Sequence, residues 1–319
     1  RLHGTGGEVG PQFIGSTPLG QALRCVSPTN HAKGKFMKQI KQVFVAGAGA
    51  MGSGIEQTAA MKGYSVILYD LENLNVETGI NTIKGSLQRF VRSKKFTEEQ
   101  KNRVLEDIRP STSLHDAVDA DFAIEAVFEN LAVKQELFGN LDGICRPETI
   151  FGTNTSSLPI SAIATGTNRR DKVICTHFMN PVPLMKGVEI IPGVETSDDT
   201  LQTTLEFITS LDKEPNVAKD YAGFVASRIL EVMLNEAVKC VMDGNKPEDI
   251  DAIVKTCLNF PMGPCELIDL AGADILLHVM ETMKEEFGDR YHAAPLLKQM
   301  VRSKNLGRKT GKGFYNYQS

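Results

Sequence analysis

A glycine pattern, Gly47-x-Gly49-x-x-Gly52, constrains the fold more than any other feature of the sequence. The apolar run "QVFVA" precedes it, the helix-like run "MGSGIEQTAAMKG" continues from it, and Asp70 ends a second apolar run, "YSVILYD". A strand, a glycine turn, a helix and a strand that ends in an acid are typical of a dinucleotide-binding βαβ unit. Gly47 permits the tight turn, Gly49 lets the backbone approach a pyrophosphate, and Gly52 allows the helix to pack closely on the strand.

The same turn indicates which dinucleotide is bound. The helix that starts with Ala50 and Met51 offers unpaired N–H groups and the positive end of its dipole to phosphates. Asp70 is placed to accept hydrogen bonds from ribose hydroxyls and would repel a 2′-phosphate, so NAD is favoured over NADP. Two alternatives are a glycine-rich packing turn with an exposed aspartate, and FAD, which also binds such turns.

Apolar runs alternate with amphipathic runs through the first two thirds of the chain, which predicts strands that alternate with helices. We expect a strand that runs into the glycine turn within 42–49, further strands at 64–70, 120–128, 149–156, 172–178 and 187–193, and helices at 51–63, 75–95, 98–108 and 130–145. This order predicts an α/β, Rossmann-like domain over residues 37–219, with a doubly wound and mostly parallel sheet.

The pattern changes after residue 219. Helical periodicity dominates in 223–244, 247–260, 264–288 and 295–305, and a short strand is expected only at 313–317. Residues 220–319 are therefore predicted to form an all-helical C-terminal domain that contributes to the substrate cleft.

Residues 1–36 differ from the rest of the chain. They are rich in Gly, Pro, Ser and Thr, show no apolar periodicity and contain a single acid, Glu8. We interpret them as a disordered extension, added to the chain or removed by processing, with Met37 as the natural start. The alternative is an organelle transit peptide, because such segments are poor in acids.

Composition excludes several classes of function. A net charge of −4 argues against a general nucleic-acid-binding protein. The six cysteines form no CxxC pair and the chain has no HExxH, so neither a zinc site nor a disulfide framework is indicated. No apolar run approaches the ~20 residues of a membrane helix, so we expect a soluble protein with no membrane partner.

The run "ICTHFMNPVPLMKGVE" contains the best candidates for proton transfer, His177 and Glu189. Imidazole titrates near neutral pH, and a carboxylate on its other nitrogen would fix the tautomer and stabilise the imidazolium. Two strands that flank the intervening turn could place the pair side by side. The alternative for His177 is a core histidine bonded to a backbone carbonyl. Ser156, in "NTSSL", could hydrogen-bond a developing carbonyl oxygen or cap a helix.

Five segments in this order, "AGAGAMGSGI", "NTSSL", "HFMNPVPLMKGVEI", "FPMGPCELIDLAG" and "GRKTGKGFYNY", resemble the L-3-hydroxyacyl-CoA dehydrogenases. The chain is most similar to the free-standing bacterial 3-hydroxybutyryl-CoA dehydrogenases. The resemblance implies reversible, NAD-linked oxidation of a short-chain 3-hydroxyacyl-CoA. It also implies a homodimer built through the helical domain, and a cytoplasmic enzyme rather than one of the mitochondrial matrix.

The resemblance also implies roles for individual residues. His177 would be the base and Glu189 its orienting partner, with Ser156 beside the substrate oxygen. The remaining positions would contact the cofactor (Glu129, Lys134, Asn154, Ser156, Asn180 and Lys309) or the substrate (Ser86, Lys94 and Asn180). Asn180 precedes a proline, so it could instead be only a turn residue.

The run "RFVRSKKF" gathers four positive charges near a predicted helix end. Our hypothesis is that some of them, Lys94 among them, meet the phosphates of CoA. The alternative is a solvated face that the helix dipole stabilises.

One position departs from the family. A "PGFxxNR" pattern usually follows the domain boundary, whereas this chain has "AGFVASR", so that Ser227 replaces the asparagine. A hydroxyl cannot reproduce the reach and the two donors of an amide. Two other functions therefore stay open: a dehydrogenase of a hydroxy acid without CoA, and an NAD-binding protein with weak catalysis that serves as a structural element or a sensor.

Overall fold

The computed structural model describes residues 40–317. The predictions for residues 1–36, and for Met37 as the natural start, concern residues outside this range. Within the described range, no helix is both long enough and apolar enough to cross a membrane.

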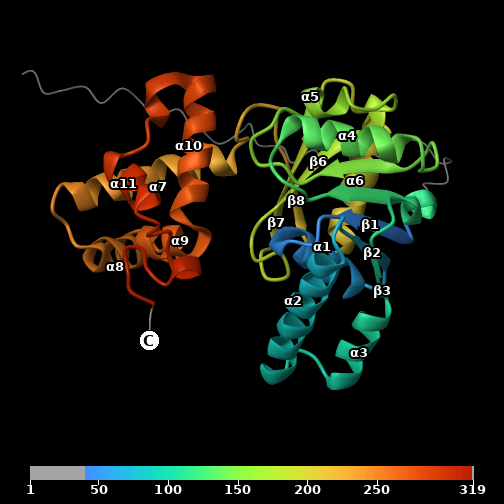
Figure 1. The fold of residues 1–319 in the computed structure, drawn as a ribbon, viewed down its shortest axis with the longest axis horizontal. Coiled ribbons are helices and arrows are strands. Elements are labelled where there is room, and N and C mark those ends of the chain that lie inside the picture. The colour runs from blue at the N-terminus through green and yellow to red at the C-terminus, as the bar shows by residue number, and fades with distance from the viewer. Residues whose placement is uncertain (1–39, 318–319) are drawn as a thin grey trace, which may run out of the picture. The chain divides into compact units, whose positions relative to one another are not determined.

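An eight-stranded sheet organises the first part of the chain, in the order β3-β2-β1-β4-β5-β6-β7-β8 (Figure 1). Neighbouring strands are parallel except β6 and β7, which are antiparallel. The order turns back between β1 and β4, which creates the switch point at which doubly wound sheets bind ligands. The strands are β1 (Gln42–Ala46), β2 (Ser65–Tyr69), β3 (Ile108–Ser111), β4 (Phe122–Glu125), β5 (Ile150–Thr153), β6 (Val173–Phe178), β7 (Gly187–Pro192) and β8 (Glu214–Val217).

Helices cover both faces of the sheet, and each face has its own core. Val43 and Val45 of β1 pack in one core, while Phe44 and Ala46 pack in the other, because successive residues of a strand point to opposite faces. The first core includes residues of α1 (Ala50–Ala60), α2 (Asn73–Arg92), α3 (Glu98–Glu106) and α6 (Asp198–Ser210), and the second those of α4 (Leu131–Asp142) and α5 (Ile160–Ala164).

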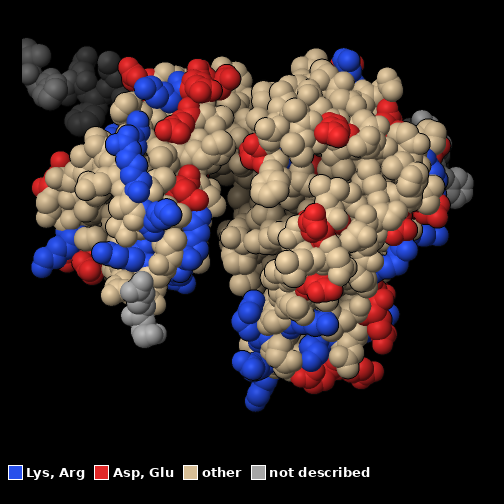
Figure 2. All heavy atoms as spheres, viewed as in Figure 1, with Lys and Arg blue, Asp and Glu red and all other residues tan. Residues whose placement is uncertain are grey.

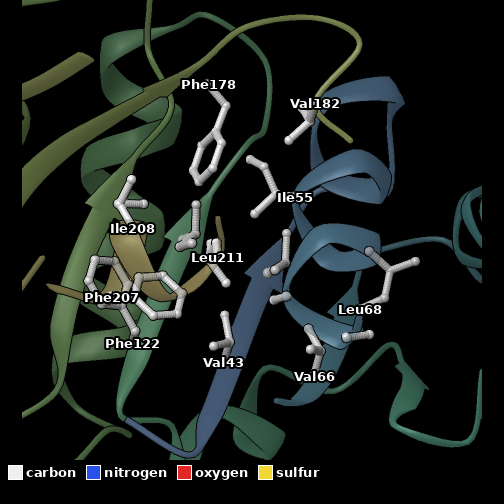
Figure 3. Packing of buried hydrophobic residues seen from close by; sticks show 14 of the residues in the cluster. Val43, Ile55, Val66, Leu68, Phe122, Phe178, Val182, Phe207, Ile208 and Leu211 are labelled. Atoms are coloured by element: carbon white, nitrogen blue, oxygen red, sulfur yellow. The ribbon is translucent and has the colours of Figure 1, made fainter. Parts of the chain in front are cut away.

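Figure 3 shows how the first core closes around β1 and β4. The rings of Phe122 and Phe207 stack with centroids 5.0 Å apart, and Ile55 of α1 packs over the neighbouring strand (Figure 3). This packing fixes α1 on the sheet, and with it the glycine turn from which α1 starts.

The sheet has two strands that the sequence did not predict, β3 and β8, and they form its two edges. In β3 the side chains of Arg109 and Pro110 are exposed, and the residues of β8, "EPNV", are not buried. An edge strand is only half covered and tolerates proline and charge, so it lacks the apolar run that marks a central strand.

The second part of the chain is helical, with α7 (Ala226–Met242), α8 (Pro247–Cys257), α9 (Pro264–Ala271), α10 (Ala273–Phe287) and α11 (Pro295–Arg302). The helix predicted over 264–288 is two helices, because Gly272 has a φ of 113° and ends α9. The strand predicted at 313–317 is also wrong: residues 307–316 form only isolated bridges.

Two buried aspartates hold the end of the described chain on these helices. Asp269 accepts hydrogen bonds from the backbone N–H groups of Phe314 and Tyr315, both at 2.9 Å. Asp251 accepts one from the Tyr315 hydroxyl at 2.6 Å. A Cβ on Gly313 would lie 1.9 Å from an Asp269 oxygen, so only glycine fits there. The segments "ELIDLAG" and "GKGFYNY" therefore work together as one structural unit.

Candidate active site

The glycine turn has a different steric environment at each glycine. Gly47 has a φ of +107°, and a Cβ on it would lie 2.4 Å from the Ala126 carbonyl oxygen. A Cβ on Gly52 would lie 1.7 Å from the Gly47 oxygen, so both positions require glycine for the fold itself. A Cβ on Gly49 would meet nothing within 4 Å, which leaves open space beside this residue.

The start of α1 and the end of β2 frame this open space. Gly49 is the N-cap and has no side chain to satisfy the N–H groups of Ala50 and Met51, which are left for an anionic ligand. One carboxylate oxygen of Asp70 accepts a hydrogen bond from the Ala48 N–H at 2.9 Å, and the other accepts one from the Asn75 side chain at 2.9 Å. Open space, free donors and a fixed carboxylate together fit the pyrophosphate and ribose of NAD.

His177 and Glu189 meet across the antiparallel pair of strands. They are direct partners in the register of β6 and β7, so their side chains project from the same face. His177 Nδ1 lies 2.8 Å from Glu189 Oε2, and the two residues are only 7% and 9% exposed. No described residue bonds Nε2, which leaves that nitrogen available to a substrate. The ring of Phe224 contacts the imidazole edge-on, with centroids 5.7 Å apart.

The other oxygen of Glu189 caps α7. Oε1 accepts hydrogen bonds from the N–H groups of Val225 at 3.1 Å and Ala226 at 2.9 Å. Burial alone would raise the pKa of Glu189. The hydrogen bond to His177 and the two backbone donors outweigh it and hold the pKa below its usual value. The glutamate is therefore ionised at neutral pH. Ser227 follows Ala226 directly, in the first turn of α7, and is buried.

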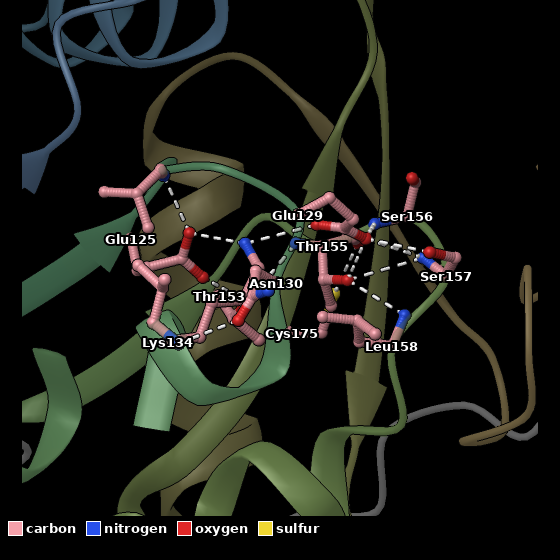
Figure 4. A network of polar contacts seen from close by, with 12 residues as sticks. Glu125, Glu129, Asn130, Lys134, Thr153, Thr155, Ser156, Ser157, Leu158 and Cys175 are labelled. Carbon is pink, nitrogen blue, oxygen red and sulfur yellow. Dashed lines mark hydrogen bonds and ion pairs between the residues drawn. The ribbon is translucent and has the colours of Figure 1, made fainter. Parts of the chain in front are cut away.

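The turn after β5 lies beside the end of β6. The side-chain oxygen of Asn154 accepts a hydrogen bond from the Phe178 N–H at 2.9 Å, which ties this turn to the residue after His177. The Ser156 N–H donates to Glu129 Oε1 at 3.1 Å, while its hydroxyl points away from Glu129 (Figure 4). Ser156 does not cap a helix, because α5 begins after Pro159.

A buried charged network supports this turn (Figure 4). Lys134, only 1% exposed, lies 2.6 Å from Glu125 Oε1 and 3.2 Å from Glu129 Oε2. Burial would raise the pKa of Glu129, but the charge of Lys134 and the hydroxyls of Thr155 and Ser157 lower it below its usual value. For Glu125 burial prevails and raises the pKa. Lys134 is thus an internal cation that holds the turn in place.

Sequence reasoning missed Glu125, Thr155 and Phe224. For Glu125 the sequence did contain a signal. Glu125 ends an apolar strand, and Lys134 follows nine residues later on the next predicted helix. A buried glutamate needs a cationic partner, which this lysine could provide. The contacts of Thr155 and Phe224 depend on tertiary packing and have no local signal.

The structure places four other predicted residues in the turn after β6, on α2, in the turn after α2 and in the helical part. Asn180 is exposed two residues after β6. Lys309 pairs with Asp274, 2.6 Å away, in the helical part. Ser86 lies on α2 and Lys94 in the turn that follows it. Within residues 40–317, none of these four is bonded to His177 or Glu189.

Basic side chains gather at the C-terminal end of α2 (Figure 2). They belong to Arg89, Arg92, Lys94 and Lys95, all of which are exposed. Ser86 lies three residues before Arg89 and nine before Lys95, so the group spans about two and a half helical turns, which an extended ligand such as CoA could cover.

Two family models cover nearly all of the described chain. "3-hydroxyacyl-CoA dehydrogenase, NAD binding domain" matches residues 42–221, and "3-hydroxyacyl-CoA dehydrogenase, C-terminal domain" matches residues 223–317. The chain belongs to the 3-hydroxyacyl-CoA dehydrogenase family. Its sheet domain is the NAD-binding domain of that family, which agrees with the open space beside Gly49 and with Asp70 at the end of β2.

Individual relatives agree with the family. The probable 3-hydroxybutyryl-CoA dehydrogenase of Bacillus subtilis is 46% identical over 282 residues, which cover 88% of this chain and 98% of the relative. The human mitochondrial hydroxyacyl-coenzyme A dehydrogenase is 38% identical over 308 residues, covering 93% of this chain and 98% of the relative. The crystal structure of (S)-3-hydroxybutyryl-CoA dehydrogenase from Ralstonia eutropha superposes with a TM-score of 0.82 at 41% identity, covering 88% of this chain and 100% of that one.

Proposed function

We propose that this enzyme reversibly oxidises (S)-3-hydroxybutyryl-CoA to acetoacetyl-CoA, with His177 as the general base. The observation that carries the proposal is the buried His177–Glu189 pair, whose Nε2 is unengaged, in a chain with an intact NAD-binding turn. NAD, when bound, accepts the hydride that leaves C3 of the substrate.

His177 removes the proton that must leave together with this hydride. Nε2 takes the proton of the 3-hydroxyl, and the C3–O bond becomes a carbonyl as C3–H is lost. Glu189, 2.8 Å from Nδ1, keeps that nitrogen protonated and stabilises the imidazolium that forms. General base catalysis of this kind typically contributes ~10²–10⁴-fold to the rate. In the reverse direction the imidazolium returns the proton to the carbonyl oxygen.

Ser156 supplies a hydrogen-bond donor to the same oxygen. Its hydroxyl is not engaged by the Glu129 network, and Asn154 ties its turn to the strand that carries His177. Glu129 and Lys134 keep their proposed place beside the cofactor, and their bonds also hold the backbone of this turn in place. In this proposal Asn180 and Lys309 contact the cofactor directly.

The CoA portion of the substrate would lie along the exposed basic end of α2. Ser86 and Lys94 are the proposed contacts, and the neighbouring arginines and lysine would meet the phosphates.

We also propose that the enzyme is a homodimer built through its helical domain, a state that sedimentation of the purified protein measures directly. A cytoplasmic location remains our prediction for this chain, and the mitochondrial location in the name of the human relative is the alternative.

A substrate panel tests the function. NADH oxidation is measured with acetoacetyl-CoA, with longer 3-ketoacyl-CoA thioesters and with free acetoacetate at equal concentrations. The proposal predicts turnover of the thioesters, highest for acetoacetyl-CoA, and little turnover of the free acid. Turnover of the free acid alone would identify a dehydrogenase of non-CoA substrates, and no turnover with any thioester would refute the proposal.

A further inference from the structure

The residues that lead into α7 contact both members of the His177–Glu189 pair. The ring of Phe224 packs edge-on against the imidazole, with ring centroids 5.7 Å apart, and the backbone N–H groups of Val225 and Ala226 bond Glu189 Oε1. Three consecutive residues therefore touch the pair. The two backbone contacts fix the carboxylate, while the side chain contacts the base itself.

Phe224 belongs to the core on the face of the sheet from which the pair projects. Cys175 and Ile191 each lie two residues along a strand from a member of the pair, so they point to the same face. Both pack in the second core, together with Phe224, which is only 2% exposed. His177 and Glu189 are thus the next side chains along the face that this core covers. The core holds the Phe224 ring in place against the imidazole.

The backbone of Phe224 has a conformation that a bulky residue rarely adopts. Its φ is 46°, in the left-handed region, and Gly223 before it has a φ of 69°. Strained backbone of this kind persists only where the surrounding structure holds it, and it concentrates at functional sites. The Phe224 N–H donates to the Tyr221 carbonyl at 2.9 Å, and the Arg228 N–H donates to the Gly223 carbonyl at 3.2 Å. In this turn the ring reaches the imidazole while the next two N–H groups face the carboxylate.

We propose that Phe224 is a positioning residue that holds the His177 imidazole in the orientation needed for proton transfer. This inference rests on the proposed function. The bond between Nδ1 and Glu189 fixes one point of the imidazole, about which the ring could still tilt. A flat side chain packed against the imidazole restricts that tilt, so that Nε2 stays aimed at the substrate's 3-hydroxyl. Orientation of this kind matters because a displacement of about 1 Å at a reacting group can cost about 10²-fold in rate.

The test replaces the ring with an aliphatic side chain. Phe224→Leu keeps an apolar group in the core but leaves space beside the imidazole. We expect kcat with acetoacetyl-CoA and NADH to fall at least about tenfold, while the dissociation constant for NADH stays within about a factor of two, because the glycine turn is unchanged. The matched control is Phe207→Leu. Phe207 is also 2% exposed, but it packs in the first core against Phe122, so its loss should lower stability and leave kcat unchanged.

A double-mutant cycle tests whether Phe224 acts through His177. In a His177→Ala background, Phe224→Leu should change the remaining kcat by less than about twofold, because the side chain that it positions is gone. A residue with a merely structural role would lower kcat to the same degree in both backgrounds. The cycle therefore distinguishes positioning of the base from a general loss of packing.

Proton NMR gives a readout that does not depend on turnover. The Nδ1–H proton of His177, whose nitrogen lies 2.8 Å from Glu189 Oε2, is identified by the loss of its signal in His177→Ala. The signal should be sharp in the wild type and in Phe207→Leu, because the imidazole is held on the carboxylate. In Phe224→Leu it should broaden, because a loosened imidazole exchanges this proton with water.

The outcomes separate this inference from the function on which it rests. An unchanged kcat for Phe224→Leu, an equal fall for Phe207→Leu, or an equal effect of Phe224→Leu without His177 would overturn the inference and leave the dehydrogenase intact. A wild type that neither binds nor turns over any CoA thioester would overturn both. If Phe224→Leu does not fold, Phe224→Met decides the question, because methionine fills irregular space in a core but offers no flat ring.

Discussion

Glu189 joins His177 to the start of α7. One of its carboxylate oxygens lies 2.8 Å from His177 Nδ1, and the other accepts hydrogen bonds from the backbone N–H groups of Val225 and Ala226. The orientation of the proposed base therefore depends on the same carboxylate that caps the first helix of the C-terminal part. In the proposed mechanism the carboxylate therefore acts both in catalysis and in structure.

The variant Glu189→Gln separates these two uses. Glutamine can still offer one oxygen to the α7 N–H groups, but its charge is gone and it cannot stabilise an imidazolium. We expect kcat to fall by at least about 10²-fold while the KM for NADH stays within a factor of two. Steady-state kinetics with acetoacetyl-CoA measure both values, and an unchanged kcat would remove Glu189 from the mechanism.

The glycine turn offers a matched pair of variants. Gly52→Ala places a Cβ 1.7 Å from a backbone oxygen and should destabilise the fold by about 1–3 kcal/mol or more. Gly49→Ala meets open space at a φ of −70°, which alanine adopts, so its thermal stability should be unchanged. Its methyl group would instead occupy the space proposed for the pyrophosphate. Calorimetry should show that Gly49→Ala binds NAD at least about tenfold more weakly than the wild type. If the variant binds NAD as tightly as the wild type, the pyrophosphate does not lie beside Gly49.

Much of this architecture could be predicted from the sequence because the decisive signals are local. The β1–turn–α1–β2 unit follows from glycine spacing and apolar runs. Two strands around a proline-containing turn were enough to propose that His177 and Glu189 meet. The edge strands β3 and β8 lack apolar runs, and the bonds from Glu189 to α7 join residues 36 and 37 positions apart. Such contacts depend on how the elements pack, and no local pattern encodes them.

Lys134 is predicted to stabilise the fold strongly. Lys134→Met would leave Glu125, which is fully buried, and Glu129 without their cation, so the free energy of unfolding should fall by about 3–5 kcal/mol. Denaturant unfolding measures this loss. Lys239→Met, which removes an exposed pair with Glu236, should cost less than about 1 kcal/mol. Equal effects of the two substitutions would contradict the assignment of Lys134 as an internal cation. Adding Glu125→Gln to Lys134→Met should restore part of the lost stability.

Glu56 on α1 should make stability fall with rising pH. Both of its carboxylate oxygens are buried without a hydrogen-bond partner, and burial raises its pKa well above the ordinary value of 4.5. Above pH 4.5 the unfolded chain releases this proton while the folded chain retains it, so the free energy of unfolding decreases until the folded pKa is passed.

The variant Glu56→Gln removes this titration. Its unfolding free energy relative to the wild type should therefore increase between pH 5 and pH 8, as measured by denaturant unfolding at each pH. Glu136→Gln, an exposed glutamate on α4, should leave the pH dependence unchanged. A parallel pH dependence in wild type and Glu56→Gln would show that Glu56 does not carry this effect.

The most direct test of the proposed mechanism is the turnover of His177→Ala with acetoacetyl-CoA and NADH, measured together with NADH binding. The substitution removes the proposed proton donor and acceptor but leaves the glycine turn and Asp70 in place. We expect kcat to fall by at least about 10²–10⁴-fold, with an NADH dissociation constant within a factor of two of the wild type. A variant that binds NADH normally and turns over at a near-normal rate would show that His177 is not the general base.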